Sequence, residues 1–187
     1  MLLKLFKNIW TRKVKNKRVT KNPKRIIWDF NFYQMSNLKT LVNQLESYIA
    51  NYEKVNLTVS QSSIGWHIDH SLMVINGIIY QLKKSNPENY KWRFNLNRIF
   101  IHSINKIPRG KVKAPKVVQP LEPATAALLI SKLEIAKNSL VDLETLNANS
   151  YFTHPYFGDL NLKNTLWFLN LHTNHHLKII KDIADNV

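Results

Sequence analysis

Residues 162–183 read LKNTLWFLNLHTNHHLKIIKDI, and this stretch carries the strongest structural pattern in the chain. Its apolar residues recur every three or four positions, which is the spacing of one face of an α-helix. That face comprises Leu162, Thr165 or Leu166, Leu169, His172, His176, Ile179 or Ile180, and Ile183. Asn161 precedes the stretch and is suited to cap the helix. The pattern predicts a long helix with imidazoles on its buried side.

The histidines of this stretch point to a metal site. At about 100° per residue, His172 and His176 lie within roughly 60° of the centre of the apolar face, and His175 lies nearer its edge. A single interior histidine is usually a structural hydrogen-bonding residue. Two adjacent neutral imidazoles in an apolar seam are costly unless a ligand or a metal engages their nitrogens. The pair therefore predicts metal binding.

A second cluster, Trp66-His67-Ile68-Asp69-His70, offers a third ligand. By helical periodicity His67 lies closer to the apolar face of its helix and His70 lies on the flank, so the residues alone leave both candidates open. Asp69 is expected to face solvent. Three histidines would leave a coordination position for water or substrate, which is typical of catalytic metal sites.

The rest of the chain predicts an all-α protein, a four-helix bundle with a long crossover between helices 2 and 3. Hydrophobic periodicity and capping residues predict helices over 37–54, from Ser62 or Ser63 to Lys84, over 124–146, and from Asn161 onward. The crossover, 88–122, has room for a short helix over 96–104. Residues 151–160 are expected to form a loop, because no alternation of apolar and polar residues predicts a sheet.

The net charge of +15 comes from two segments. Residues 1–25 carry ten Lys or Arg and no acid, and 89–121 carry eight and no acid. We interpret 1–25 as a basic N-terminal arm and 26–187 as the helical domain. One interpretation is that the charge of these two segments only keeps the protein soluble. The alternative is a non-enzymatic role in which the arm and the basic loop 89–121 bind nucleic acid or an anionic surface.

The sequence also excludes several structural features and kinds of binding site. No apolar run approaches the roughly 18 residues that would span a bilayer, so a cytoplasmic protein without a transmembrane segment is expected. The chain has no cysteine, so metal ligands must come from His, Asp, Glu or water. The four glycines form no phosphate-binding or dinucleotide-binding motif.

Three motifs resemble the DinB-like metalloprotein superfamily, in particular a bacterial branch of unknown function with a His-Pro-Phe-Phe-Gly-type loop. They are Ser63-Ile64-Gly65-Trp66-His67-Ile68-Asp69-His70, His154-Pro155-Tyr156-Phe157-Gly158-Asp159-Leu160, and His172-Thr173-Asn174-His175-His176-Leu177. The resemblance covers about residues 35–184 and leaves the arm outside. It implies a four-helix bundle that binds one divalent ion, zinc or nickel, through three histidines.

In the family pattern the first ligand lies five residues after a glycine of the second helix, which corresponds to His70. The other two form a His-x-x-x-His motif, which corresponds to His172 and His176. The resemblance thus favours His70 over His67. His67 and His175 become pocket or supporting candidates, and His154 either packs its turn or lines the pocket.

The resemblance also suggests chemistry and partners. Some relatives with this ligand pattern are thiol S-transferases, and others look like hydrolases or isomerases. We expect a metal-dependent enzyme that acts on a small molecule, for which a low-molecular-weight thiol is one candidate partner. Apolar bundle faces make a homodimer plausible.

Overall fold

The structure, a computed structural model, describes residues 23–110, 115–120 and 123–185. Within these ranges the protein is mostly helical, with five α-helices and one two-stranded antiparallel sheet. The elements are α1 (Pro23–Ser47), α2 (Ile64–Lys84), α3 (Leu96–Ile104), α4 (Ala126–Asp142), β1 (Tyr151–His154), β2 (Gly158–Asn161) and α5 (Leu162–Asp185). No helix in the described part of the chain is long and apolar enough to cross a membrane.

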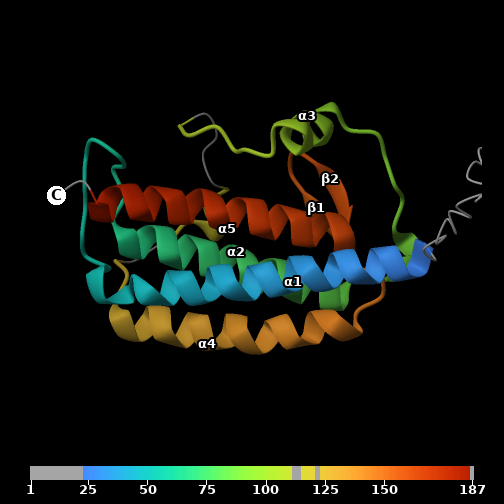
Figure 1. The fold of residues 1–187 in the computed structure, drawn as a ribbon, viewed down its shortest axis with the longest axis horizontal. Coiled ribbons are helices and arrows are strands. Elements are labelled where there is room, and N and C mark those ends of the chain that lie inside the picture. Colours follow the sequence, from blue (N-terminus) through green and yellow to red (C-terminus); the bar gives the residue numbers. More distant parts are fainter. Residues whose placement is uncertain (1–22, 111–114, 121–122, 186–187) are drawn as a thin grey trace, which may run out of the picture.

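The long helices α1, α2, α4 and α5 lie side by side and share one hydrophobic core (Figure 1). α2 packs against both α4 and α5, and α1 packs against the same two helices. The core is built from the apolar faces of these helices, with fully buried side chains that include Leu38, Leu45, Ile68, Leu72, Ile75, Leu129, Leu133, Leu166, Leu169 and Ile180. This packing places the histidines of α2 opposite those of α5.

Polar caps start the helices where the sequence predicts. Ser63 Oγ accepts a hydrogen bond from the Trp66 backbone N–H at 3.1 Å, and Asn161 Oδ1 accepts one from the Asn164 N–H at 3.2 Å. Each cap satisfies a donor that the first helical turn leaves without an intrahelical partner. The predicted starts of α2 and α5 are confirmed.

The first helix differs from its prediction at both ends. It begins at Pro23 instead of about residue 37 and ends at Ser47 instead of 54, so Ser36 is inside the helix. The middle of the helix contacts α5, where Asn170 Nδ2 donates to Gln34 Oε1 at 2.9 Å and Asn170 Oδ1 accepts from Asn37 Nδ2 at 2.6 Å. Such long-range contacts leave no local sequence signal. Residues 1–22 of the predicted arm lie outside the described residues.

The prediction of an all-α chain without a sheet was wrong for residues 151–161. β1 and β2 form a hairpin in which Tyr151 faces Asn161 and His154 faces Gly158. Gly158 has a φ of 68°, a left-handed conformation that glycine adopts without the penalty of a side chain. Strands of four residues are too short for alternation to show in the sequence, and burial of Phe152 and Leu160 against the helices stabilises the pair.

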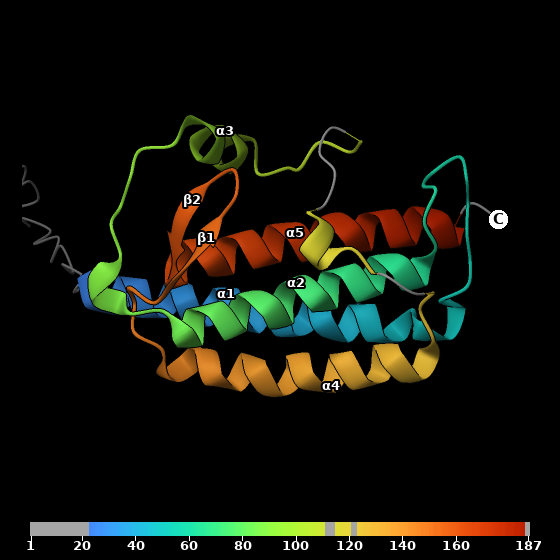
Figure 2. The same cartoon turned by 180° about the vertical axis from the view of Figure 1, so that it is seen from behind.

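The crossover lies over this hairpin. α3 sits above β1 and β2, on the side of the molecule opposite α4 (Figure 1, Figure 2). The short helix predicted over 96–104 is confirmed, and Asn95 caps it by accepting the Arg98 N–H at 2.8 Å. The chain then returns along α5 toward the histidines.

Candidate metal centre

Three histidine side chains from two helices converge in the space between α2 and α5. His70 comes from α2, and His172 and His176 come from successive turns of α5. One ligand atom from each ring can be chosen so that all three lie within 4.8 Å of one another. Among the described residues this is the one group of three or more His, Cys, Asp or Glu with such spacing, and it could hold a metal ion.

The ring nitrogens of His70 and His172 face one another. His70 Nε2 and His172 Nε2 are 3.2 Å apart. His70 Nδ1 lies 2.7 Å from the carbonyl oxygen of Val118 and must donate its proton there, because a carbonyl only accepts. Neutral His70 therefore carries no proton on Nε2, and its lone pair points at His172.

His172 cannot satisfy both of its nitrogens in this arrangement. Its Nδ1 is buried without a hydrogen-bond partner. If His172 Nε2 carries the proton it can donate to His70, but then Nδ1 is a buried bare lone pair; if Nε2 is bare, two lone pairs meet at 3.2 Å. A divalent cation bound by the two Nε2 atoms would separate their lone pairs and leave the His172 proton on Nδ1, so the facing donors of His70 and His172 fit such an ion.

His67 supports His176 rather than joining the cluster. His67 Nδ1 lies 3.0 Å from His176 Nδ1, and its Nε2 lies 3.0 Å from Ser60 Oγ. If His176 donates from Nδ1 to His67, its Nε2 lone pair becomes free and His67 Nε2 donates to Ser60. A partner of this kind fixes the tautomer and orientation of a metal-binding imidazole.

Trp66 packs against the exposed side of the cluster. Its indole stacks on the His70 ring with centroids 5.1 Å apart and planes 16° apart. The Trp66 ring thus covers one face of a candidate ligand and limits the orientations that His70 can take.

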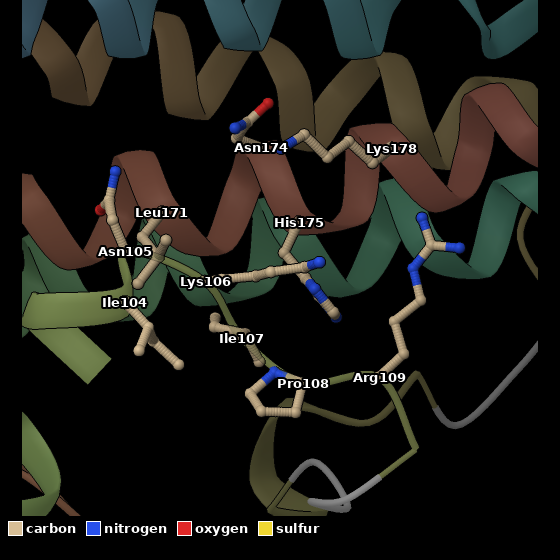
Figure 3. A pocket seen from close by; sticks show the side chains of 10 residues that line it. All are labelled: Ile104, Asn105, Lys106, Ile107, Pro108, Arg109, Leu171, Asn174, His175 and Lys178. Atoms are coloured by element: carbon tan, nitrogen blue, oxygen red, sulfur yellow. The ribbon is translucent and has the colours of Figure 1, made fainter. Parts of the chain in front are cut away.

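His175 faces a different space, a cavity of about 590 Å³ between α5 and the segment after α3. Figure 3 shows its lining residues, which are Ile104, Asn105, Lys106, Ile107, Pro108, Arg109, Leu171, Asn174, His175 and Lys178. The lining contains three cationic side chains and no carboxylate, although Arg109 pairs with Asp182 at 2.7 Å. The His175 ring lies 5.1 Å from that of His176, so the cavity borders the histidine cluster.

His154 is used by its own turn. Its Nδ1 accepts the backbone N–H groups of Tyr156 at 3.1 Å and Phe157 at 3.3 Å. The ring stacks on Phe157 with centroids 4.3 Å apart and lies edge-on to Phe168 at 4.7 Å. His154 does not line the cavity, and of the two roles considered the packing role matches its contacts.

Asp69 does not face solvent as expected. Its carboxylate is buried and accepts from Lys132 Nζ of α4 at 2.5 Å. The side chain points toward α4, on another face of α2 from the histidine cluster, so this residue ties two helices together. The position of Asp69 next to His70 in the sequence gave no indication that its partner would be Lys132.

Burial keeps the histidines of this region neutral at pH 7. It lowers the pKa of His67, His154 and His175 to about 4 each. Burial, followed by the mutual proximity of the rings, also holds the pKa of His172 and His176 well below the usual range. Burial lowers the pKa of His70 as well, opposed by its bond to Val118 and by Asp69. Neutral imidazoles are the form that binds metals.

Sequence reasoning missed the groups that orient the rings. The Val118 carbonyl comes from the crossover, 48 positions beyond His70, and Ser60 comes from the loop before α2. A backbone carbonyl carries no residue-specific signal, and a loop serine is among the commonest of residues. The structure alone brings both groups to the site.

Comparisons with known proteins agree with these observations. The sequence model of one protein family, described as the DinB superfamily, matches residues 36–180. No curated protein and no solved structure gives a significant match.

Proposed function

The chain belongs to the DinB superfamily, and from this premise and the geometry of its histidines we propose that it is a metal-dependent protein that acts on a small anionic molecule. We assign His70, His172 and His176 as ligands of one divalent ion, zinc or nickel. We also assign α1, α2, α4 and α5 to a four-helix bundle of the DinB type, with the crossover between its second and third helices. The observation that carries the proposal is the convergence of one ligand atom each from His70, His172 and His176 to within 4.8 Å of one another.

The chain's own residues would prepare this centre. The Val118 carbonyl would hold the His70 proton on Nδ1, His67 Nδ1 would accept the N–H of His176, and Ser60 would accept the N–H of His67, so Nε2 of both His70 and His176 would be free to bind. A divalent cation held by three neutral imidazoles supplies Lewis acidity for water or a thiol. Trp66 restricts access from one side.

The cavity beside His175 supports an anionic substrate. Lys106, Arg109 and Lys178 line this cavity together with apolar residues that include Ile107 and Leu171, and no lining residue carries negative charge. A carboxylate or phosphate would be attracted by these cations, and an apolar portion would contact the apolar residues. Since the chain has no cysteine, any thiol in the reaction comes from the substrate. Thiol S-transfer and hydrolysis are both compatible with this arrangement.

Elemental analysis tests the metal assignment. We expect about one zinc or nickel per chain in the wild-type protein and a near-complete loss in the double variant His172→Ala, His176→Ala. His175→Ala is the matched control, because it removes an imidazole from the same helix outside the proposed ligand set. Far-ultraviolet circular dichroism verifies that each variant is folded. Equal metal content in the double variant and the wild type would contradict the assignment.

Ligand binding tests the substrate class. We expect the metal-loaded protein to bind mercaptosuccinate, an anionic thiol, more tightly than uncharged 2-mercaptoethanol, by about tenfold or more. The preference should disappear in Lys106→Ala, Lys178→Ala, and should persist in Lys83→Ala, a lysine of α2 that pairs with Asp142 instead. Calorimetric titration measures both affinities. A preference that survives loss of both cavity lysines would show that the cavity does not select charge.

A further inference from the structure

α3 buries Arg98 and packs Ile101 against the core, while four of its apolar side chains are exposed. Arg98 is buried and donates to the carbonyls of Phe157 at 3.5 Å and Asp159 at 3.2 Å, and also to that of Arg93. The opposite face carries Leu96, Ile99, Phe100 and Ile104, whose exposed fractions are 72%, 43%, 60% and 43%. A helix on the surface of a globular protein normally shows the reverse arrangement.

The preceding segment extends this apolar surface. Trp92 and Phe94 are 63% and 65% exposed. We call these two residues, together with Leu96, Ile99, Phe100 and Ile104, the α3 surface. Six exposed apolar side chains within thirteen residues indicate an interaction site. In Figure 1 and Figure 2 the helix α3 itself lies at the edge of the molecule farthest from α4.

The α3 surface is also positively charged. Lys91, Arg93, Lys106 and Arg109 flank it in sequence and are exposed. No acidic residue occurs between Glu88 and Glu122. Of these four cations Arg109 pairs with Asp182, so the excess positive charge comes from the other three; around α4, lysines pair with acids, as in Lys39–Glu144 and Lys137–Glu46. The partner of the α3 surface must therefore accept apolar side chains and supply negative charge.

Three kinds of partner can be compared on these grounds. A second copy in a symmetric dimer would bring two cationic surfaces together, which charge repulsion opposes. Nucleic acid would use the cations and the rings of Trp92 and Phe100, but it offers no apolar volume for Leu96 and Ile99. The interface of an anionic bilayer accepts both kinds of side chain. We propose that the α3 surface docks the protein on anionic lipid membranes.

The rigid attachment of α3 suits this role. Arg98 bonds to carbonyls of the hairpin, and Asn95 Nδ2 donates to the Tyr156 carbonyl at 3.1 Å. The apolar face is thus held outward in advance, so docking does not require the helix to fold or turn over. Ordering the surface before binding removes an entropic cost.

A local probe tests the proposal, because the basic segment 1–25 could bind vesicles independently. The chain has no cysteine, so Phe100→Cys can be labelled at one site with an environment-sensitive nitrobenzoxadiazole dye. Ile135→Cys is the matched control, since Ile135 is 51% exposed on α4. We expect the dye at position 100 to brighten and shift to the blue with vesicles of phosphatidylcholine containing about 30 mol% phosphatidylserine. The dye at position 135 should not respond.

Sedimentation with the same vesicles measures the contribution of the apolar residues in the unlabelled full chain. Leu96→Ser, Ile99→Ser should weaken partitioning on the order of tenfold or more. The control pair Ile130→Ser, Ile135→Ser, with exposed fractions of 50% and 51%, should leave it unchanged. Since all four side chains are solvent-exposed, both variants should fold, and circular dichroism checks that they do.

Several outcomes would overturn the proposal. Binding without a response at position 100 would assign the membrane contact to another segment. A response to a duplex oligonucleotide but not to vesicles would identify nucleic acid as the partner. A response that grows with protein concentration in the absence of lipid would indicate contact between copies of the chain.

Discussion

His154 and the cluster of His70, His172 and His176 are alike in burial and in their lowered pKa, and they differ in where their nitrogens point. His154 Nδ1 accepts two N–H groups of its own turn. In the cluster, His70 Nε2 faces His172 Nε2 and His172 Nδ1 has no partner. A low pKa reports desolvation in both regions; only the direction of the lone pairs separates a packing histidine from a candidate ligand.

The strongest test of this contrast is metal-dependent stability. Binding to the folded state adds about 2.7 kcal/mol when free metal is 100 times its Kd. Zinc or nickel should therefore raise the Tm of the wild-type protein and of His154→Ala, but not that of His70→Ala. Differential scanning calorimetry with and without metal measures the shift. An undiminished shift in His70→Ala would remove this residue from the ligand set.

The second test measures the free energy of unfolding of the metal-free protein. His154→Ala removes the acceptor for two N–H groups and the ring packed on Phe157 and Phe168, so it should lower the free energy of unfolding by about 2 kcal/mol. Urea denaturation in the presence of chelator measures the loss. Metal affinity should be unchanged in the variant that still folds. A stable variant with weakened metal binding would reassign His154 to the metal region.

His67 provides a third test of this difference, because it contacts His176 but is not one of the three proposed ligands. His67→Ala leaves the Nδ1 proton of His176 without its acceptor and should weaken metal binding by about tenfold. His67→Asn should restore part of the affinity, since its amide oxygen can accept at nearly the same position. Competition with a chromogenic chelator gives both values. Equal affinity in wild type and His67→Ala would mean that His67 does not orient His176.

The smallest expected effect is the dependence of stability on pH. The pKa of His154 is about 4 in the folded protein, because of burial, against 6.5 ordinarily. Between these two pH values the unfolded state binds more protons than the folded state. The contribution of His154 to stability is therefore fully present above pH 6.5 and is lost as the pH falls toward 4. His154 contributes a slope of at most about 1.4 kcal/mol per pH unit, reduced by its partial exposure.

Urea midpoints of metal-free wild type and His154→Ala across this range measure that slope. The difference between the two proteins should shrink as the pH falls, because the wild type alone loses the contribution of His154. A difference that stays constant with pH would show that the ring is not held neutral by its turn.

Much of the fold was predictable because its signals are local. The helical spacing of apolar residues predicted the cores of α2, α4 and α5, and Ser63, Asn95 and Asn161 mark helix starts through side-chain caps. The middle of α1 contacts Asn170 of α5, and the hairpin depends on pairing across a turn and on packing against α5. Neither contact has a counterpart in the adjacent sequence.

Some residues of the candidate site could likewise be placed from the sequence, and others could not. The phase of α5 alone brings His172 and His176 to one face, whereas periodicity on α2 favoured His67 over His70. Both α2 histidines are buried, so the periodicity of the helix alone does not separate them. Packing puts His70 opposite His172 and leaves His67 between His176 and Ser60.

The sequence by itself determined which residue types are present and on which helical faces they lie, because periodicity and capping act within a few residues. The sequence also determined that the crossover is basic and has no acidic residue over 89–121, because charge follows directly from composition. Only the tertiary structure decided that the Val118 carbonyl meets His70, that Asp69 meets Lys132, and that α3 turns its apolar face outward. Those outcomes depend on contacts between residues far apart in the chain, and such contacts form only when the helices pack.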